Sequence, residues 1–145
     1  MHRFRLGLLA LSALLAVGAG YTVTTQTASA QASTRLVLTL SEFAIQAERP
    51  AVPAGDVTFD LVNTGEDTHE VIVIKSDQDI TKLPPSAVKG EVDEAAVGEY
   101  IGGWEDIPSA GLASGTLSLA PGRYILLCNL TKHYEQGMVA TLLVE

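Results

Sequence analysis

Hydrophobic and polar residues alternate along most of the chain from residue 34 onward, which is the pattern of β-strands with one buried face. Residues 56–63 (DVTFDLVN) show it most clearly, because Val57, Phe59 and Leu61 fall on one face. We predict strands at 34–40, 56–63, 68–75, 116–119, 123–128 and 138–144, with 43–45 continuing the first strand after a kink.

Residues 68–75 (THEVIVIK) differ from the other strands because Val71 to Ile74 are apolar on both faces. Such a strand lies in the centre of a sheet or is covered on both sides. Turn sequences such as Asn63 to Asp67 and Pro121-Gly122 separate the strands. Short strands, frequent turns and little helix predict an all-β Greek-key β-sandwich.

The segment 76–113 does not follow this alternation, and it predicts one short helix or an irregular insert in the sandwich. Residues 92–100 fit a helix of two turns, which Gly102 and Gly103 would end. We expect Trp104 to pack as a lid over one edge of the core. The acids of this segment are expected to form a solvated face: Glu91, Asp93, Glu94, Glu99, Glu105 and Asp106.

The first 30 residues have the organisation of a secretory signal peptide. Arg3 and Arg5 precede the apolar stretch 6–17, and Ala28-Ser29-Ala30 offers a cleavage site, with 30–32 as an alternative. The apolar stretch is shorter than the ~20 residues that span a bilayer, so an uncleaved membrane anchor is the weaker interpretation. We therefore predict a signal at 1–30, one domain at 34–145 and a periplasmic or secreted protein.

The charge of the chain changes when the predicted signal is removed. Nine basic residues stand against 17 acidic residues in the whole chain; without Arg3 and Arg5 seven basic residues remain, and the net charge becomes −10. Such an acidic surface argues against nucleic acid and anionic membranes as partners, and favours a basic face on a protein partner. Plain solubility would also explain it.

Beyond residue 30 the soft donor residues are few: His69, Cys128, His133 and Met138. A single cysteine cannot form an internal disulfide. Singly, each residue has an ordinary explanation, since a lone cysteine or methionine often fills a core and a histidine can satisfy hydrogen bonds at a turn. Together they point to one metal site.

The spacing of the last three donors indicates how they can meet. Cys128, His133 and Met138 lie five residues apart, which places them on three different faces of an α-helix. In one strand the histidine would point away from the cysteine. Only a loop that folds back between two strands brings all three together, and Gly137 suits the turn that ends it.

His69 follows the Asn63–Asp67 turn, so it also lies at an end of the sandwich, on the face of Val71 and Val73. Two imidazoles, one thiolate and one thioether are the donor set of a blue-copper electron-transfer site. Zinc is the first rival, but structural zinc sites do not use methionine. We therefore predict one copper ion.

The pattern Cys128-x4-His133-x4-Met138, preceded by 120–124 (APGRY) and paired with His69 after an Asn-Thr-Gly turn, resembles the cupredoxins, the relatives of plastocyanin, azurin and auracyanin. The resemblance covers most of the chain beyond the signal and is most specific in its C-terminal third. It implies a cupredoxin-type sandwich with one type 1 copper ion, in which His69, Cys128 and His133 are equatorial copper ligands and Met138 is the axial ligand. It also implies that His133, flanked by Leu130, Tyr134 and Gly137, is the electron port.

One position departs from the family. Many cupredoxins have asparagine after the first ligand histidine, where it braces the cysteine loop by hydrogen bonds; this chain has Glu70. Asn129 or Asn63 would then supply part of the bracing.

We predict from this resemblance an exported, monomeric blue-copper protein that shuttles single electrons between partners such as a cytochrome or an oxidase. The alternative is a periplasmic copper carrier or buffer with the same fold. An enzyme is disfavoured, because further copper centres would need histidines beyond His69 and His133, and the chain has no Cys-x-x-Cys-His for covalent haem.

Overall fold

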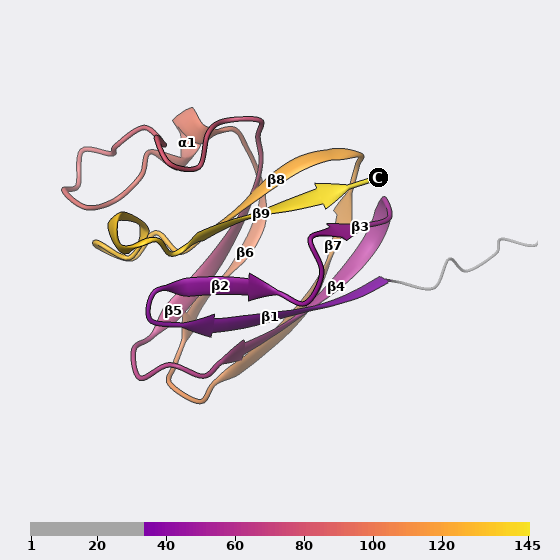
Figure 1. The fold of residues 1–145 in the computed structure, drawn as a ribbon, viewed down its shortest axis with the longest axis horizontal. Coiled ribbons are helices and arrows are strands. Elements are labelled where there is room, and N and C mark those ends of the chain that lie inside the picture. The colour runs from indigo at the N-terminus through magenta and orange to yellow at the C-terminus, as the bar shows by residue number, and fades with distance from the viewer. Residues whose placement is uncertain (1–33) are drawn as a thin grey trace, which may run out of the picture. The chain divides into compact units, whose positions relative to one another are not determined.

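The computed structural model of the protein describes residues 34–145; the predicted signal peptide and its cleavage site lie outside the described residues. The described part is a β-sandwich with one four-residue α-helix and one 3₁₀ turn (Figure 1). Its elements are β1 (Thr34–Ser41), β2 (Ala44–Ala47), β3 (Ala51–Val52), β4 (Gly55–Asn63), β5 (His69–Lys75), α1 (Glu94–Val97), β6 (Glu99–Ile107), β7 (Leu112–Leu119), β8 (Gly122–Leu127), η1 (Tyr134–Gln136) and β9 (Val139–Val144).

Two sheets form the layers of the sandwich. One has the strand order β2-β1-β4-β7 and the other has the order β3-β9-β8-β5-β6. Both are mixed, because β1 runs parallel to β4 and β3 runs parallel to β9, while the remaining pairs are antiparallel. This arrangement confirms the predicted all-β sandwich. No helix of residues 34–145 has the length and apolar character needed to span a membrane.

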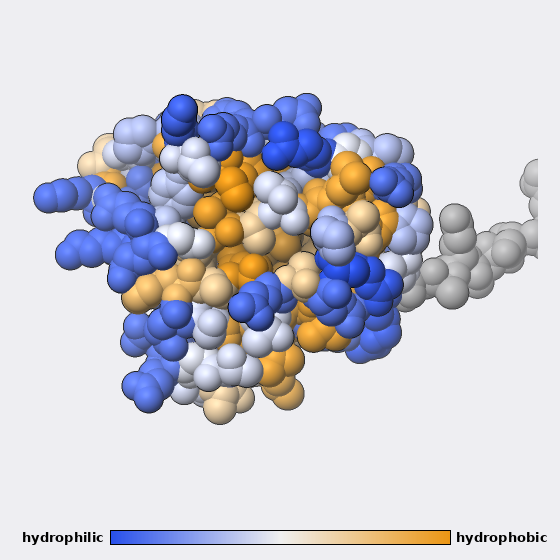
Figure 2. All heavy atoms as spheres, viewed as in Figure 1, coloured by the Kyte–Doolittle hydropathy of each residue, from blue (hydrophilic) through white to orange (hydrophobic). Residues whose placement is uncertain are grey.

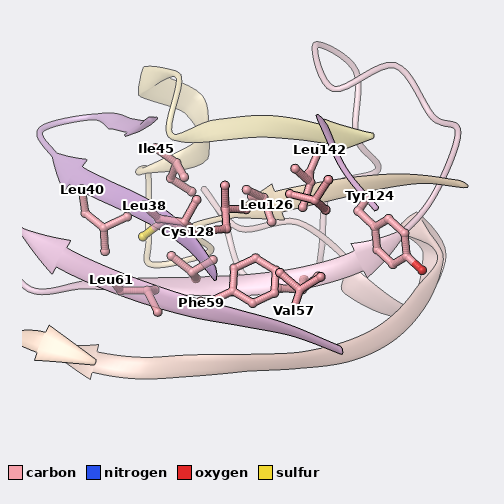
Figure 3. Packing of buried hydrophobic residues seen from close by; sticks show 14 of the residues in the cluster. Leu38, Leu40, Ile45, Val57, Phe59, Leu61, Tyr124, Leu126, Cys128 and Leu142 are labelled. Carbon is pink, nitrogen blue, oxygen red and sulfur yellow. The ribbon is translucent and has the colours of Figure 1, made fainter. Parts of the chain in front are cut away.

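The core lies between the sheets and is built from the predicted inward positions. Leu36 and Leu38 of β1 and Val57 and Phe59 of β4 have no exposed surface. Figure 3 shows Tyr124 at one end of the labelled residues and Cys128 toward the other end. Each such apolar side chain contributes about 1.5–3 kcal/mol by leaving water, and Cys128 belongs to this same buried cluster.

Strand β5 is covered on both faces, as its sequence predicts. Val71 and Val73 belong to the main core. Ile72 and Ile74 point the other way, into a second apolar cluster that includes Leu83, Val92 and Val97 of the insert and Ile125 and Leu127 of β8. The insert at 76–98 therefore covers the outer face of the second sheet.

Two local predictions were wrong, and strand β6 was not predicted. Residues 43–45 do not continue β1; the chain reverses after Ser41, and β2 pairs antiparallel with β1. The predicted two-turn helix at 92–100 is a single turn with Asp93 as its N-cap. Residues 99–107, which belong to the segment expected to be a short helix or an irregular insert, form β6 on the edge beside β5, with irregular register at two places. Trp104 of this strand packs against Phe59 at 5.3 Å between ring centroids and lies over one edge of the core, as expected.

Candidate metal centre

The loop 128–138 joins β8 to β9 and folds back on itself. Cys128 follows the end of β8, and its backbone N–H donates to the carbonyl of Met138 at 3.1 Å. Met138 in turn donates its N–H to the carbonyl of His133 at 3.0 Å. His133 caps the 3₁₀ turn η1, and Gly137 ends it in the left-handed conformation (φ 104°). The structure therefore has the tight turn and glycine that the spacing predicts.

Three donor atoms converge where this loop meets the start of β5. His133 Nδ1 lies 3.3 Å from His69 Nδ1 and 3.3 Å from Cys128 Sγ. All three atoms lie within 4.8 Å of one another. With metal–nitrogen bonds of about 2.0–2.1 Å, two nitrogens on one trigonal ion lie about 3.5 Å apart, so the spacing fits a single ion.

Met138 completes the predicted set from the same end of the core. Its side chain is fully buried and belongs to the apolar cluster that contains Cys128. The backbone bond between Met138 and Cys128 places these residues opposite each other at the base of the loop. The structure thus brings the thioether residue to the neighbourhood of the other three predicted donors.

Burial governs the charge of the site. It raises the pKa of the Cys128 thiol; hydrogen bonds from the backbone of Glu70 and Leu130 offset part of this rise, and the Glu70 carboxylate adds a little to it. Burial also lowers the pKa of His133, with a smaller contribution from the neighbouring His69. A metal ion held by these residues would displace the thiol proton and bind the neutral form of His133, so its binding would strengthen as pH rises.

Glu70, at the position where the resemblance implies a bracing asparagine, braces the cysteine loop itself. Its carboxylate Oε1 accepts the backbone N–H of Asn129 at 2.8 Å, directly after the cysteine. Glu70 is buried, and its pKa is raised chiefly by that burial and further by Glu94 and other acids. A carboxylate thus anchors the cysteine loop, and it does so at an electrostatic cost.

Asn129 joins the same loop to the insert. Its side-chain oxygen accepts the N–H of Val92 at 2.7 Å, and its amide nitrogen donates to the Val92 carbonyl at 3.1 Å and to Glu94 at 2.8 Å. Asn129 therefore braces the site, as the sequence suggests, but by holding residues 92–94 rather than by contacting a donor.

The insert holds the rest of the loop as well. Lys132 donates its N–H to the carbonyl of Gly90 at 2.8 Å. The hydroxyl of Tyr134 donates to the carbonyl of Ile80 at 2.9 Å and accepts the N–H of Leu83 at 2.9 Å. Because these bonds flank His133 on both sides, the insert restricts movement of the histidine loop.

The turn before His69 has its own brace in Asn63, which is 1% exposed. Its amide nitrogen donates to the carbonyls of Asp67 at 2.8 Å, Ile107 at 3.0 Å and Pro108 at 3.0 Å. Its side-chain oxygen accepts the N–H of Gly65 at 2.9 Å. Asn63 thus fixes the turn that leads into His69 against the end of β6.

Two residues of the β1–β2 turn also reach the site, and the sequence pattern did not single them out. Glu42 Oε1 lies 3.2 Å from His69 Nε2. The ring of Phe43 lies edge-on to the ring of His133 at 5.0 Å between centroids. Both contacts join segments more than 20 residues apart, and no local periodicity indicates them.

The surface beside the loop carries charge. Glu70, Glu91, Glu94 and Glu105 line a hollow of about 350 Å³ together with Leu130 and neighbouring residues. Figure 2 shows hydrophilic side chains protruding at the left end of the molecule, where the insert and the loop 128–138 lie in Figure 1. Three of the acids expected to form a solvated face therefore gather next to the donor loop.

Comparisons with known proteins agree with this architecture. The sequence model of the Sulfocyanin (SoxE) domain matches residues 16–145. A dithionite-reduced auracyanin from the photosynthetic bacterium Roseiflexus castenholzii is similar in structure, with a TM-score of 0.57 and 22% identity over 79% of this chain and 99% of that chain. Auracyanin B has a TM-score of 0.56 and 21% identity over 77% of this chain and 88% of that chain. Rusticyanin from Thiobacillus ferrooxidans has a TM-score of 0.55 and 19% identity over 78% of this chain and 77% of that chain. A comparison with curated protein sequences gives no match.

Proposed function

Because the chain belongs to the sulfocyanin family of blue-copper cupredoxins, we propose that it is a small electron carrier whose His69, Cys128, His133 and Met138 hold one type 1 copper ion. The cupredoxin resemblance and the copper cofactor predicted from the sequence are thereby confirmed at the level of the family. The single observation that carries the ligand assignment is the convergence of three donor atoms within 4.8 Å, two of them on fully buried residues.

The copper ion supplies a one-electron couple, and the chain controls its surroundings. Cys128 and Met138 are buried beside the ends of β8 and β9, and the insert and Asn63 hold the two segments that carry the histidines. A site held in this way needs little rearrangement when its charge changes by one. Hydrophobic cover from the core excludes water from the sulfur donors.

His133 is the proposed electron port. Among the three converging donors, His69 and Cys128 are fully buried, whereas His133 is partly exposed. Half-buried Leu130 and Tyr134 flank it, so a partner can approach through an apolar rim. The acidic hollow beside Leu130 supports a partner with a basic docking face, such as a cytochrome or an oxidase. We further propose, from residues 1–30, that the protein works after export.

The function is tested by the spectrum and the kinetics of the copper-loaded protein. We expect an intense blue colour that disappears on reduction, and electron exchange with a basic cytochrome that slows several-fold as ionic strength rises from 10 to 200 mM, because salt screens the attraction. Glu105→Gln should weaken the salt dependence, whereas Ser118→Ala, remote from the loop, should not. Rates that are insensitive to salt would contradict the steering, and a colourless protein that passes Cu(I) to another chain would indicate a copper carrier.

Met138→Leu tests the axial ligand. Leucine fills nearly the same buried space but has no donor atom, so the variant should stay folded and blue while Cu(II) loses a weak ligand. We therefore expect the reduction potential to rise, measured by voltammetry against the wild-type protein. An unchanged or lower potential would remove Met138 from the ligand set.

A further inference from the structure

We propose that Glu42 is a positioning residue of the copper centre, which orients His69 through the ring nitrogen opposite to the donor nitrogen. The inference rests on the proposed function, since it concerns how a ligand is held. It gives the β1–β2 turn, which contributes no donor, a direct part in the site.

The two nitrogens of His69 face different groups. Nδ1 lies 3.3 Å from His133 Nδ1, toward the converging donors, and Nε2 lies 3.2 Å from Glu42 Oε1. A carboxylate only accepts hydrogen bonds, so this contact favours the tautomer with its proton on Nε2. The Nδ1 lone pair is then directed at the place where Cys128 Sγ and His133 Nδ1 meet.

The Glu42 carboxylate is itself fixed. The same Oε1 accepts the N–H of Asp67 at 2.8 Å, so it is bonded both to His69 and to the turn that leads into His69. The carboxylate also lies close over Gly65, where an added Cβ would come within 2.2 Å of Oε1. Glu42 therefore holds the β4–β5 turn and the imidazole together as one unit.

The next residue of the turn reinforces this geometry. Phe43 packs edge-on against His133 at 5.0 Å, and the two imidazoles lie 5.2 Å apart in a T-shaped arrangement. Adjacent residues of one turn thus contact both histidines, one by a charged hydrogen bond and one by an aromatic edge. The β1–β2 turn forms a third wall of the site beside the loop 128–138 and the start of β5.

A carboxylate in this position has an electronic effect as well as a geometric one. A hydrogen bond from the distal N–H of a metal-bound histidine to a carboxylate makes the ring more basic, and losing such a partner typically costs 10–100-fold in metal affinity. The added negative charge favours Cu(II) over Cu(I). Glu42 therefore lowers the reduction potential of the site.

Glu42→Gln tests the charge while keeping an oxygen for the Asp67 N–H. We expect the preference for Cu(II) over Cu(I) to fall about tenfold, which raises the potential by about 59 mV for a one-electron couple. Glu66→Gln is the matched control, because it removes one charge from an exposed residue of the β4–β5 turn. Its potential should stay near that of the wild type, and equal shifts in the two variants would overturn the proposal.

A second measurement needs no copper. In ¹⁵N NMR spectra of the reduced, metal-free wild-type protein, His69 is expected as the Nε2–H tautomer, and Glu42→Leu should shift the population toward Nδ1–H. A wild-type Nδ1–H tautomer overturns the proposal whether or not any variant folds. A wild-type protein that fails to turn blue with copper would instead contradict the proposed function and leave this test in place.

Discussion

Cys128→Ser is expected to abolish the blue colour of the copper-loaded protein completely while leaving the β-sandwich folded. The intense visible band of a blue-copper site comes from the thiolate–copper bond, and a serine hydroxyl cannot replace it at neutral pH. The Cys128 side chain is fully buried, with Sγ 3.3 Å from His133 Nδ1, so the replacement removes the donor from the centre of the cluster.

The variant has a second, smaller effect on stability. A hydroxyl in a mostly apolar environment costs about 1–3 kcal/mol unless it finds a hydrogen-bond partner. His133 Nδ1 is within reach of the Cys128 position and offsets part of this cost. Circular dichroism and thermal unfolding of the metal-free protein should therefore show a native fold with a modestly lower Tm.

The blue band of Cys128→Ser is measured by visible absorption with one equivalent of copper. Met138→Leu is the control, because it keeps the thiolate. Persistence of the blue band in Cys128→Ser would exclude Cys128 as the copper ligand. Loss of the band in both variants, with both proteins folded, would mean that the colour depends on the whole cluster rather than on the thiolate bond.

The donor loop could be predicted from the sequence because its constraint is local. Five-residue steps from Cys128 to His133 to Met138 fit neither a helix nor a strand, and a glycine precedes the methionine. His69 could be placed by its parity with Val71 and Val73, since alternate residues of a strand share a face. The structure places all three of these β5 side chains in the interior with no exposed surface.

Strand β6 could not be predicted in the same way. Glu99–Ile107 lies on a sheet edge, and Gly102 and Gly103 interrupt its middle. The glycines fit close packing, since a Cβ on Gly103 would approach the carbonyl of Val71 at 2.8 Å. An edge strand that is mostly exposed and pairs irregularly does not show the alternation of hydrophobic and polar residues that identifies a strand in the sequence.

The hydrogen-bond partners around the site could not be predicted from the sequence for a different reason. Glu42, Asn129 and Tyr134 act on partners 25 to 54 residues away. Such contacts depend on how turns meet at one end of the sandwich, which composition and periodicity do not encode. The donor residues are thus predictable from chemistry and spacing, and Asn129 could be named as a brace, but the partners of these hydrogen bonds emerge only from the fold.

Asn63→Ala is expected to give the largest loss of stability among the bracing residues, on the order of 2–4 kcal/mol. The substitution leaves the carbonyls of Asp67, Ile107 and Pro108 and the N–H of Gly65 without their partner in a site that is 1% exposed. In a domain of this size the change lowers the Tm by about 10 °C, measured by calorimetry on the metal-free protein.

Asn63→Asp distinguishes the hydrogen bonds that the Asn63 amide nitrogen donates from the one that its side-chain oxygen accepts. Aspartate keeps the oxygen that accepts the Gly65 N–H, but it loses the donors and sets a negative charge against three carbonyl oxygens. We therefore expect stability to fall in the order wild type, Asn63→Ala, Asn63→Asp. If Asn63→Asp were as stable as the wild type, the donated bonds would contribute nothing.

The hydrogen bonds of Asn63 should also affect copper affinity, because they help to hold His69. Residue 69 pairs with Ile107, whose carbonyl accepts a bond from Asn63, so loosening this corner frees the start of β5. Because the site then has to be ordered as the ion binds, copper affinity should fall along with stability in both variants. Titration with a competing chelator measures the loss, and an affinity equal to that of the wild type in a destabilised Asn63→Ala would show that His69 is held by Glu42 and its strand neighbours alone.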